Sequence, residues 1–156
     1  MSADPSLPGI IAPPPLLYIG AFAIAAIGHV VFPLSVTSGN LIVRLIGGVV
    51  FIASALLARW AFLTMRKVGT SANPRKESVA LSTSGPFAFS RNPIYLAMTG
   101  LYIGASALFN SWWPLLLLPP LLYLMHRGVI LREERYLLAQ FGSTYASYKI
   151  AVRRWL

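Results

Sequence analysis

Four long apolar runs, separated by clusters of basic residues, constrain the fold more than any other feature of this sequence. The first two runs are Leu16 to about Leu34 and Leu41 to Met65. The third is Ile94 to Phe109, and the fourth starts at Trp113 and continues past Leu131. As a helix, a run of about 20 residues crosses a hydrocarbon core of about 30 Å. The runs therefore predict an all-α integral membrane protein with about four transmembrane helices.

The composition supports this class. Of the 156 residues, 56% are hydrophobic and only 11% are charged, whereas a soluble domain carries roughly 25% charged residues. We expect one membrane domain over 1–156, with two variable N-terminal spans in 1–65 and the polar motifs in 66–156. The absence of cysteine excludes disulfides, thiolate metal sites and cysteine nucleophiles, and we expect no metal.

The net charge of +9 is concentrated in two places. Eleven of the 13 Lys and Arg residues lie between Arg66 and Arg91 or between Arg127 and Arg154. Basic clusters beside apolar runs mark the cytosolic side of a membrane protein. We therefore expect both termini and the 68–90 connection in the cytosol, with membrane lipids rather than nucleic acid as partners.

Glycine and proline predict where the helices begin, bend and end. Pro13-Pro14-Pro15 should block helix until Leu16, and Pro119-Pro120 should kink the fourth helix. Gly142 should end the helix that leaves the bilayer, and Ser143 or Thr144 can cap a final short helix.

Small residues in the second run would let a neighbouring helix approach closely and would suit a homodimer. They are Gly47, Gly48, Ala53, Ser54, Ala55 and Ala58.

Two polar motifs lie at the outer ends of the third and fourth runs. The first motif is Gly85 to Leu96, and the second is Arg132-Glu133-Glu134-Arg135. Because the two runs form a membrane hairpin, both motifs should lie on the same side of the bilayer. We interpret them as two halves of one site.

Glu133 and Glu134 are the only adjacent acids among four in the chain. Neighbours on a helix point about 100° apart, so one can face the bundle while the other faces water or the loop. By spacing, His126 shares a face with Glu133, and Arg127 shares one with Glu134. Either this is a solvated helix end with intrahelical ion pairs, or one glutamate binds the positive part of a ligand.

The first motif favours a ligand. Arg91 offers a fixed fork for a carboxylate, Asn92 offers a donor and an acceptor, and Pro93 begins a helix whose N–H groups favour anions. A site that accepts both charges suits a zwitterionic cofactor such as S-adenosylmethionine. Four aromatic side chains could line its adenine slot: Phe87, Phe89, Tyr95 and Tyr136. No glycine-rich fingerprint follows a strand, which excludes a dinucleotide-binding domain.

The motifs resemble those of the isoprenylcysteine carboxyl methyltransferase and phospholipid methyltransferase superfamily. The resemblance covers 66–156, and Gly69-Thr70 with Asn73-Pro74 looks like its bacterial branch. It implies an integral membrane methyltransferase, in a bacterial inner membrane, that binds S-adenosylmethionine at the cytosolic end. We assign cofactor binding to Gly85, Pro86, Phe87, Arg91, Asn92, Pro93, Tyr95, Leu96, Glu133, Glu134 and Tyr136. We assign catalysis to Arg91, Glu133, Glu134 and His126.

The acceptor stays open among a lipid amine, a carboxylate and a thiol. Asn92 replaces the histidine typical of the prenylcysteine branch, and Ala97 replaces a frequent glycine, so the resemblance leans toward a lipid amine. An amine must lose a proton, which Glu133, Glu134 or His126 could take.

A four-span transporter or a non-catalytic membrane protein is the alternative. A proton-coupled transporter needs an intramembrane carboxylate, and none of the four acids is expected at mid-membrane.

Overall fold

The computed structural model describes residues 9–38, 40–69 and 80–156, and within these ranges the regular structure is helical, with no strand. The elements are α1 (Pro14–Val31), α2 (Leu41–Lys67), the short 3₁₀ helix η1 (Gly85–Ala88), α3 (Pro93–Leu108), α4 (Trp113–Met125), the π-helix η2 (His126–Ile130) and α5 (Leu131–Ala151).

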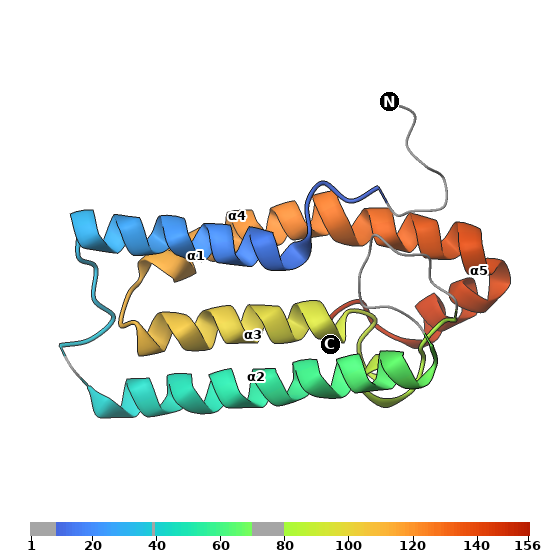
Figure 1. Ribbon diagram of the computed structural model, residues 1–156, viewed down its shortest axis with the longest axis horizontal. Helices are drawn as coiled ribbons and strands as arrows, with labels where there is room; N and C mark the ends of the chain where they lie inside the picture. The colour runs from blue at the N-terminus through green and yellow to red at the C-terminus, as the bar shows by residue number, and fades with distance from the viewer. Residues whose placement is uncertain (1–8, 39, 70–79) are drawn as a thin grey trace.

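The helices form an up-and-down bundle in which α2 lies beside α3 and α1 lies beside α4 (Figure 1). Three helical stretches are long and apolar enough to cross a membrane, namely Pro14–Val31, Leu41–Lys67 and the continuous Trp113–Ala151, and α3 is a shorter apolar helix. The all-α membrane fold is therefore confirmed.

The stretch from α4 through α5 is too long to lie wholly within a bilayer. Its 39 residues would extend roughly 58 Å as a helix, about twice the thickness of a hydrocarbon core. Apart from Arg127, the charged residues of this stretch begin at Arg132. We therefore place the membrane-crossing part in α4 and η2. α5 lies beyond the membrane-crossing part, at the end of the bundle that we call the basic end.

Small residues bring α2 and α3 into close contact, as the sequence predicted. A Cβ atom on Gly104 would lie 2.8 Å from the Gly47 carbonyl oxygen, and one on Gly100 would overlap the Ser54 hydroxyl. Real Cβ atoms do not approach other atoms so closely, so this helix pair requires its glycines. The neighbour of Gly47 and Ser54 is thus a helix of the same chain.

One prediction about prolines is changed by the structure. α1 begins at Pro14 rather than Leu16, with Pro13 as its N-cap, because first-turn residues need no N–H partner within the helix. α4 continues through Pro119 and Pro120, which lack the N–H groups for two helical hydrogen bonds, and the π-helix η2 follows further on.

Gly142 breaks α5 as expected. Its backbone angles, φ 51° and ψ −124°, are non-helical, and the chain reverses there (Figure 1). The reversal returns 143–151 and the C-terminal residues toward the start of α3. It positions the site described below.

The opposite end of the bundle holds the connections between α1 and α2 and between α3 and α4. Asn110 joins the two, accepting from the Thr37 N–H at 3.0 Å and donating to the Thr37 carbonyl at 2.9 Å. The His29 ring lies 5.2 Å from the Phe109 ring at this same end. This position agrees with a packing role for His29, far from both polar motifs.

Candidate active site

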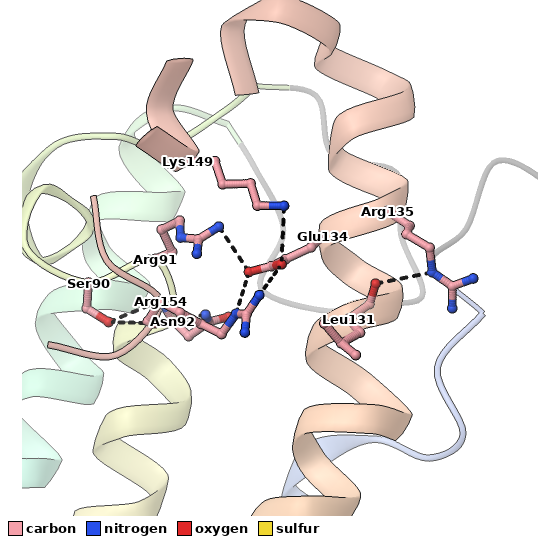
Figure 2. Close-up of polar contacts among 8 residues, drawn as sticks. All are labelled: Ser90, Arg91, Asn92, Leu131, Glu134, Arg135, Lys149 and Arg154. Carbon is pink, nitrogen blue, oxygen red and sulfur yellow. Dashed lines mark hydrogen bonds and ion pairs between the residues drawn. The ribbon is translucent and has the colours of Figure 1, made fainter. Parts of the chain in front are cut away.

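The two polar motifs meet at the basic end of the bundle, around the carboxylate of Glu134 (Figure 2). Arg91 from the first motif places Nη1 3.0 Å from Oε1 of Glu134. Arg154 binds the same carboxylate with both arms of its guanidinium, Nε to Oε1 and Nη2 to Oε2, each at 2.8 Å. Lys149 Nζ lies 4.0 Å from Oε2. One buried carboxylate thus collects three cations.

Arg91 is held in this cluster with hydrogen-bonding capacity to spare. Its side chain is only 9% exposed. Its Nη1 atom is engaged in the ion pair with Glu134, whereas its Nε atom is buried and has no hydrogen-bond partner within the part of the chain that the structure describes. A buried donor without a partner is costly, so the Nε–H group is available for an anionic ligand.

The end of the chain lies against the first motif. The Arg91 N–H donates to the Arg153 carbonyl at 2.9 Å, and the Asn92 amide Nδ2 donates to the Arg154 carbonyl at 3.0 Å. The Tyr148 hydroxyl donates to the Phe87 carbonyl at 2.7 Å. The Asn92 amide therefore donates its hydrogen bond to the C-terminal segment and helps to fix the position of Arg154.

Glu133 faces away from this cluster and into the bundle. Its Oε1 accepts a hydrogen bond of 2.7 Å from the Tyr95 hydroxyl on α3. Burial raises the pKa of the Glu133 carboxyl to about 7, although the bond from Tyr95 acts in the opposite direction. The two adjacent glutamates thus point to different surroundings, as helical geometry predicted.

Glu134 has the opposite electrostatic balance. Burial alone would raise its pKa, but the Arg154 hydrogen bond and the charges of Arg91, Arg154 and Lys149 outweigh burial and lower it. Glu134 is therefore an anion at neutral pH, while Glu133 can gain or lose a proton near pH 7. The site combines a fixed negative charge with a titrating carboxyl.

The remaining residues of the first motif build the wall beside α2. Gly85 has a φ of +59°, and a Cβ there would lie 3.0 Å from Thr64 Oγ1, so both conformation and space call for glycine. Pro86, Phe87 and Pro93 are buried. Phe89 is 43% exposed, and its ring lies 6.1 Å from that of Trp60 on α2.

Tyr95, Leu96 and Tyr136 lie on the helices that flank the site. Tyr95 and Tyr136 are buried and Leu96 is partly buried. His126 belongs to η2, and the structure gives its ring no hydrogen bond to Glu133. The π-helix changes the spacing assumed for a regular α-helix, and Arg127 lies over the Tyr123 ring at 5.9 Å instead of pairing with Glu134.

Four residues of the site were missed by sequence reasoning: Tyr145, Tyr148, Lys149 and Arg154. Tyr145 is 2% exposed, and burial, followed by the Glu134 charge, raises the pKa of its phenol. The run from Phe141 to Tyr148 belongs to the motifs that carry the family resemblance, and a break was expected at Gly142, but neither signal indicated the direction that the chain takes after it.

The fold and this cluster define an all-α membrane protein with a buried charged cluster at one end of its bundle. A model of the phospholipid methyltransferase family matches residues 42–144, about two thirds of the chain. The chain belongs to this family, and is thus a membrane methyltransferase, in agreement with the superfamily resemblance. Comparison with curated proteins and with solved structures finds no match. The matched region contains both polar motifs and ends before Lys149 and Arg154.

Proposed function

We propose that this protein transfers a methyl group from S-adenosylmethionine to the amine of a lipophilic acceptor that enters from the bilayer. The active site is the Arg91–Glu133–Glu134 region, and it faces the cytosol. The observation that carries the proposal is the combination of one unpaired buried donor, Nε of Arg91, with two glutamates of opposite protonation tendency.

The residues present fit the methyl donor. The unpaired Nε donor of Arg91 suits its carboxylate, and the anionic Glu134 suits its amino group. Aromatic walls for an adenine come from Phe87, Tyr145 and Tyr148, which lie around the same cluster. When bound, S-adenosylmethionine supplies an electrophilic methyl group on a sulfonium.

Glu133 is assigned as the base. An amine acceptor gains a methyl group and loses a proton, and the Glu133 carboxylate accepts that proton. A carboxyl with a pKa of about 7 suits this task at neutral pH, and the Tyr95 hydroxyl holds it in position. A carboxylate acceptor would need no such base, so Glu133 favours an amine.

Positioning supplies most of the rate acceleration. Arg91 and Glu134 fix the donor, and burial of the cluster excludes water. Holding two reactants in line contributes roughly 7–11 kcal/mol to lowering a barrier.

Proton-coupled transport is disfavoured by the position of the acids. Both carboxylates that the structure describes lie in α5, and α1 to α4 carry none. Such transporters couple through a carboxylate within the bilayer. The cluster also has a buried donor without a partner in the described chain, Nε of Arg91, which favours a ligand over a purely structural role.

The proposal is tested by calorimetry of the purified protein with S-adenosylmethionine, followed by transfer of a radiolabelled methyl group to long-chain amines. We expect binding by the wild type and a loss of more than tenfold in affinity for Glu134→Gln. Arg135→Gln is the control, because Arg135 points away from the cluster and bonds only its own helix, at the Leu131 carbonyl (Figure 2). Absence of cofactor binding by the wild type would refute the proposal.

A further inference from the structure

The π-helix η2 lies directly before the two glutamates. Within it the Leu131 N–H donates to the His126 carbonyl, five residues back rather than the four of an α-helix. Single π-turns are rare inside α-helices and frequently lie at functional sites. The turn adds one residue, which rotates all that follows by about 100° relative to an unbroken α-helix. The directions of the α5 side chains therefore depend on η2.

This rotation decides which side chain of α5 faces Tyr95. Met125, just before the turn, is fully buried in the core. In an unbroken α-helix residues seven apart share a face, so Arg132 would follow Met125 into the bundle. With the extra residue, Glu133 takes that direction instead, and its carboxyl accepts the 2.7 Å hydrogen bond from the Tyr95 hydroxyl. Without the π-turn, an arginine would point toward Tyr95.

The start of the described chain packs across this turn at two points. Inside η2, the Gly128 carbonyl accepts from the Ile11 N–H at 3.2 Å, and a Cβ on Gly128 would overlap the Ile11 side chain. Just beyond η2, Arg132 Nη1 donates to the Gly9 carbonyl at 2.6 Å. We call these two contacts, Ile11 with Gly128 and Gly9 with Arg132, the N-terminal clamp. The clamp contacts the chain both within the π-turn and after it.

We propose that the N-terminal clamp is a positioning device for the reaction, which holds the π-turn and so directs Glu133 into the bundle. The inference rests on the proposed function, in which Glu133 is the base. Ile10 anchors the clamp, because its side chain packs against the buried core cluster. The bond from Arg132 to Gly9 also keeps the arginine out of the place that Glu133 occupies.

The direction of Glu133 is tested by cross-linking, which does not depend on turnover. Cysteine pairs are introduced into the full-length chain, which has no cysteine of its own. Dibromobimane, a short reagent that joins two thiols, should link Tyr95→Cys to Glu133→Cys but not to Arg132→Cys. Gly128→Val, whose side chain does not fit beside Ile11, should lower the yield of the first pair at least fivefold.

Gly20→Val is the matched control, because a Cβ on this α1 glycine would meet no atom within 4 Å. Its cross-linking should equal that of the parent chain. Combining Gly128→Val with Ile11→Ala should recover at least half of the lost yield, since the smaller side chain makes room. A normal yield in Gly128→Val, or no recovery in the double variant, would overturn the clamp.

Arg132 is tested by kinetics in a variant that leaves η2 unchanged. Arg132→Met keeps the aliphatic stem and removes the donors to Gly9. We expect kcat to fall at least tenfold while KM for S-adenosylmethionine changes less than twofold. The midpoint of the pH profile should move below 7, because a less buried Glu133 has a lower pKa.

Arg135→Met is the control, since the Arg135 guanidinium bonds the Leu131 carbonyl of its own helix and takes no part in the clamp. An Arg132→Met protein with the wild-type kcat and pH midpoint would overturn the positioning role. The proposed function is judged separately: if the wild type cross-links as expected but transfers no methyl group, the clamp stands and the methyltransferase proposal fails.

Discussion

At the scale of single residues, the site depends on the contrast between two adjacent glutamates. The Glu134 carboxylate forms ion pairs with three basic side chains, whereas the Glu133 carboxyl accepts a hydrogen bond from the neutral Tyr95 hydroxyl. Charged partners stabilise a carboxylate and burial without them destabilises it. Two identical side chains one position apart thereby differ in protonation, which is the basis of the separate roles that we propose for them, binding a cation and moving a proton.

Replacing Glu133 tests its assignment as the base. In the wild type, methylation of an amine should rise with pH through about 7, as the Glu133 carboxyl ionises. Glu133→Gln should lower the rate at least a hundredfold and remove this rise. Rates at saturating donor between pH 5.5 and pH 8.5 provide the measurement. A Gln variant that keeps the same pH profile would exclude Glu133 as the titrating group.

The same variant has a stability signature. Because the folded pKa of Glu133 is raised, ionisation disfavours the folded state, so its stabilising contribution is complete below about pH 4.5 and is lost as pH rises through about 7. Glu133→Gln should therefore gain stability relative to the wild type at pH 8.5 but not at pH 5. Thermal unfolding in one detergent at both pH values measures the difference. An equal difference at the two values would contradict the assigned shift.

Arg154 provides the second test at this scale. Its two bonds to Glu134 hold the C-terminal segment in place and orient the carboxylate. Arg154→Gln should lower the melting temperature and weaken cofactor binding at least fivefold. Arg154→Lys should not restore binding, because lysine lacks the planar fork. Arg153→Gln, the adjacent exposed arginine, should bind normally; loss of binding in both variants would indicate a general charge effect.

The meeting of Arg91 with the glutamates could be predicted from sequence, but the role of Arg154 could not. A hairpin of two apolar runs places its outer ends on one side, which brings Arg91 and Glu134 to the same level. Arg154 reaches the site only through the reversal at Gly142, whose direction no sequence pattern fixes. The sequence also suggested that the Asn92 amide binds a ligand. In the structure the amide instead donates to the Arg154 carbonyl, which belongs to the returning segment and so could not be foreseen.

At the scale of elements, the break within α5 carries the active-site geometry. Gly142 adopts φ 51° and ψ −124°, a region that side-chain-bearing residues rarely enter. Residues 143–151 then run back so that Tyr148 reaches Phe87. A continuous α-helix would instead carry these residues away from the bundle.

Gly142→Ala tests this element. We expect a loss of about 1–3 kcal/mol in stability, from the strained backbone alone, since no atom lies within 4 Å of a Cβ placed there. Methyl transfer should fall at least tenfold, because Arg154 and Tyr148 are displaced. Gly20→Ala, at a glycine of α1 with equally open surroundings, is the control for adding a methyl group. Normal activity in Gly142→Ala would show that the break is not required.

The π-helix η2 is the element that sequence patterns could least predict. The prolines at 119 and 120 lie inside α4, whereas the π-helical hydrogen bonding falls at His126–Ile130, where the sequence has no proline. The Ile11 N–H reaches the Gly128 carbonyl there at 3.2 Å, and its side chain packs on Gly128, where a Cβ would not fit. This contact with a distant part of the chain explains why local propensity was not sufficient.

At the scale of the whole molecule, the two ends of the bundle differ in charge. The connections at the far end, 32–40 and 109–112, contain no charged residue. The basic end holds Arg66, Lys67 and Arg91 and the charged face of α5. The positive-inside rule predicts that the basic end lies in the cytosol. The proposed function would then take its methyl donor from the cytosol and its acceptor from the bilayer.

Single-cysteine labelling tests this orientation without background, because the chain has no cysteine of its own. Ser38→Cys, Ser84→Cys and Ser147→Cys place thiols at exposed positions, the first at the far end and the others at the basic end. A membrane-impermeant maleimide applied to intact cells should label only the thiol at position 38. The other two should react only after permeabilisation, since α2 separates position 38 from position 84. Labelling of position 84 or 147 in intact cells would place the active site outside and overturn the assignment of a cytosolic donor.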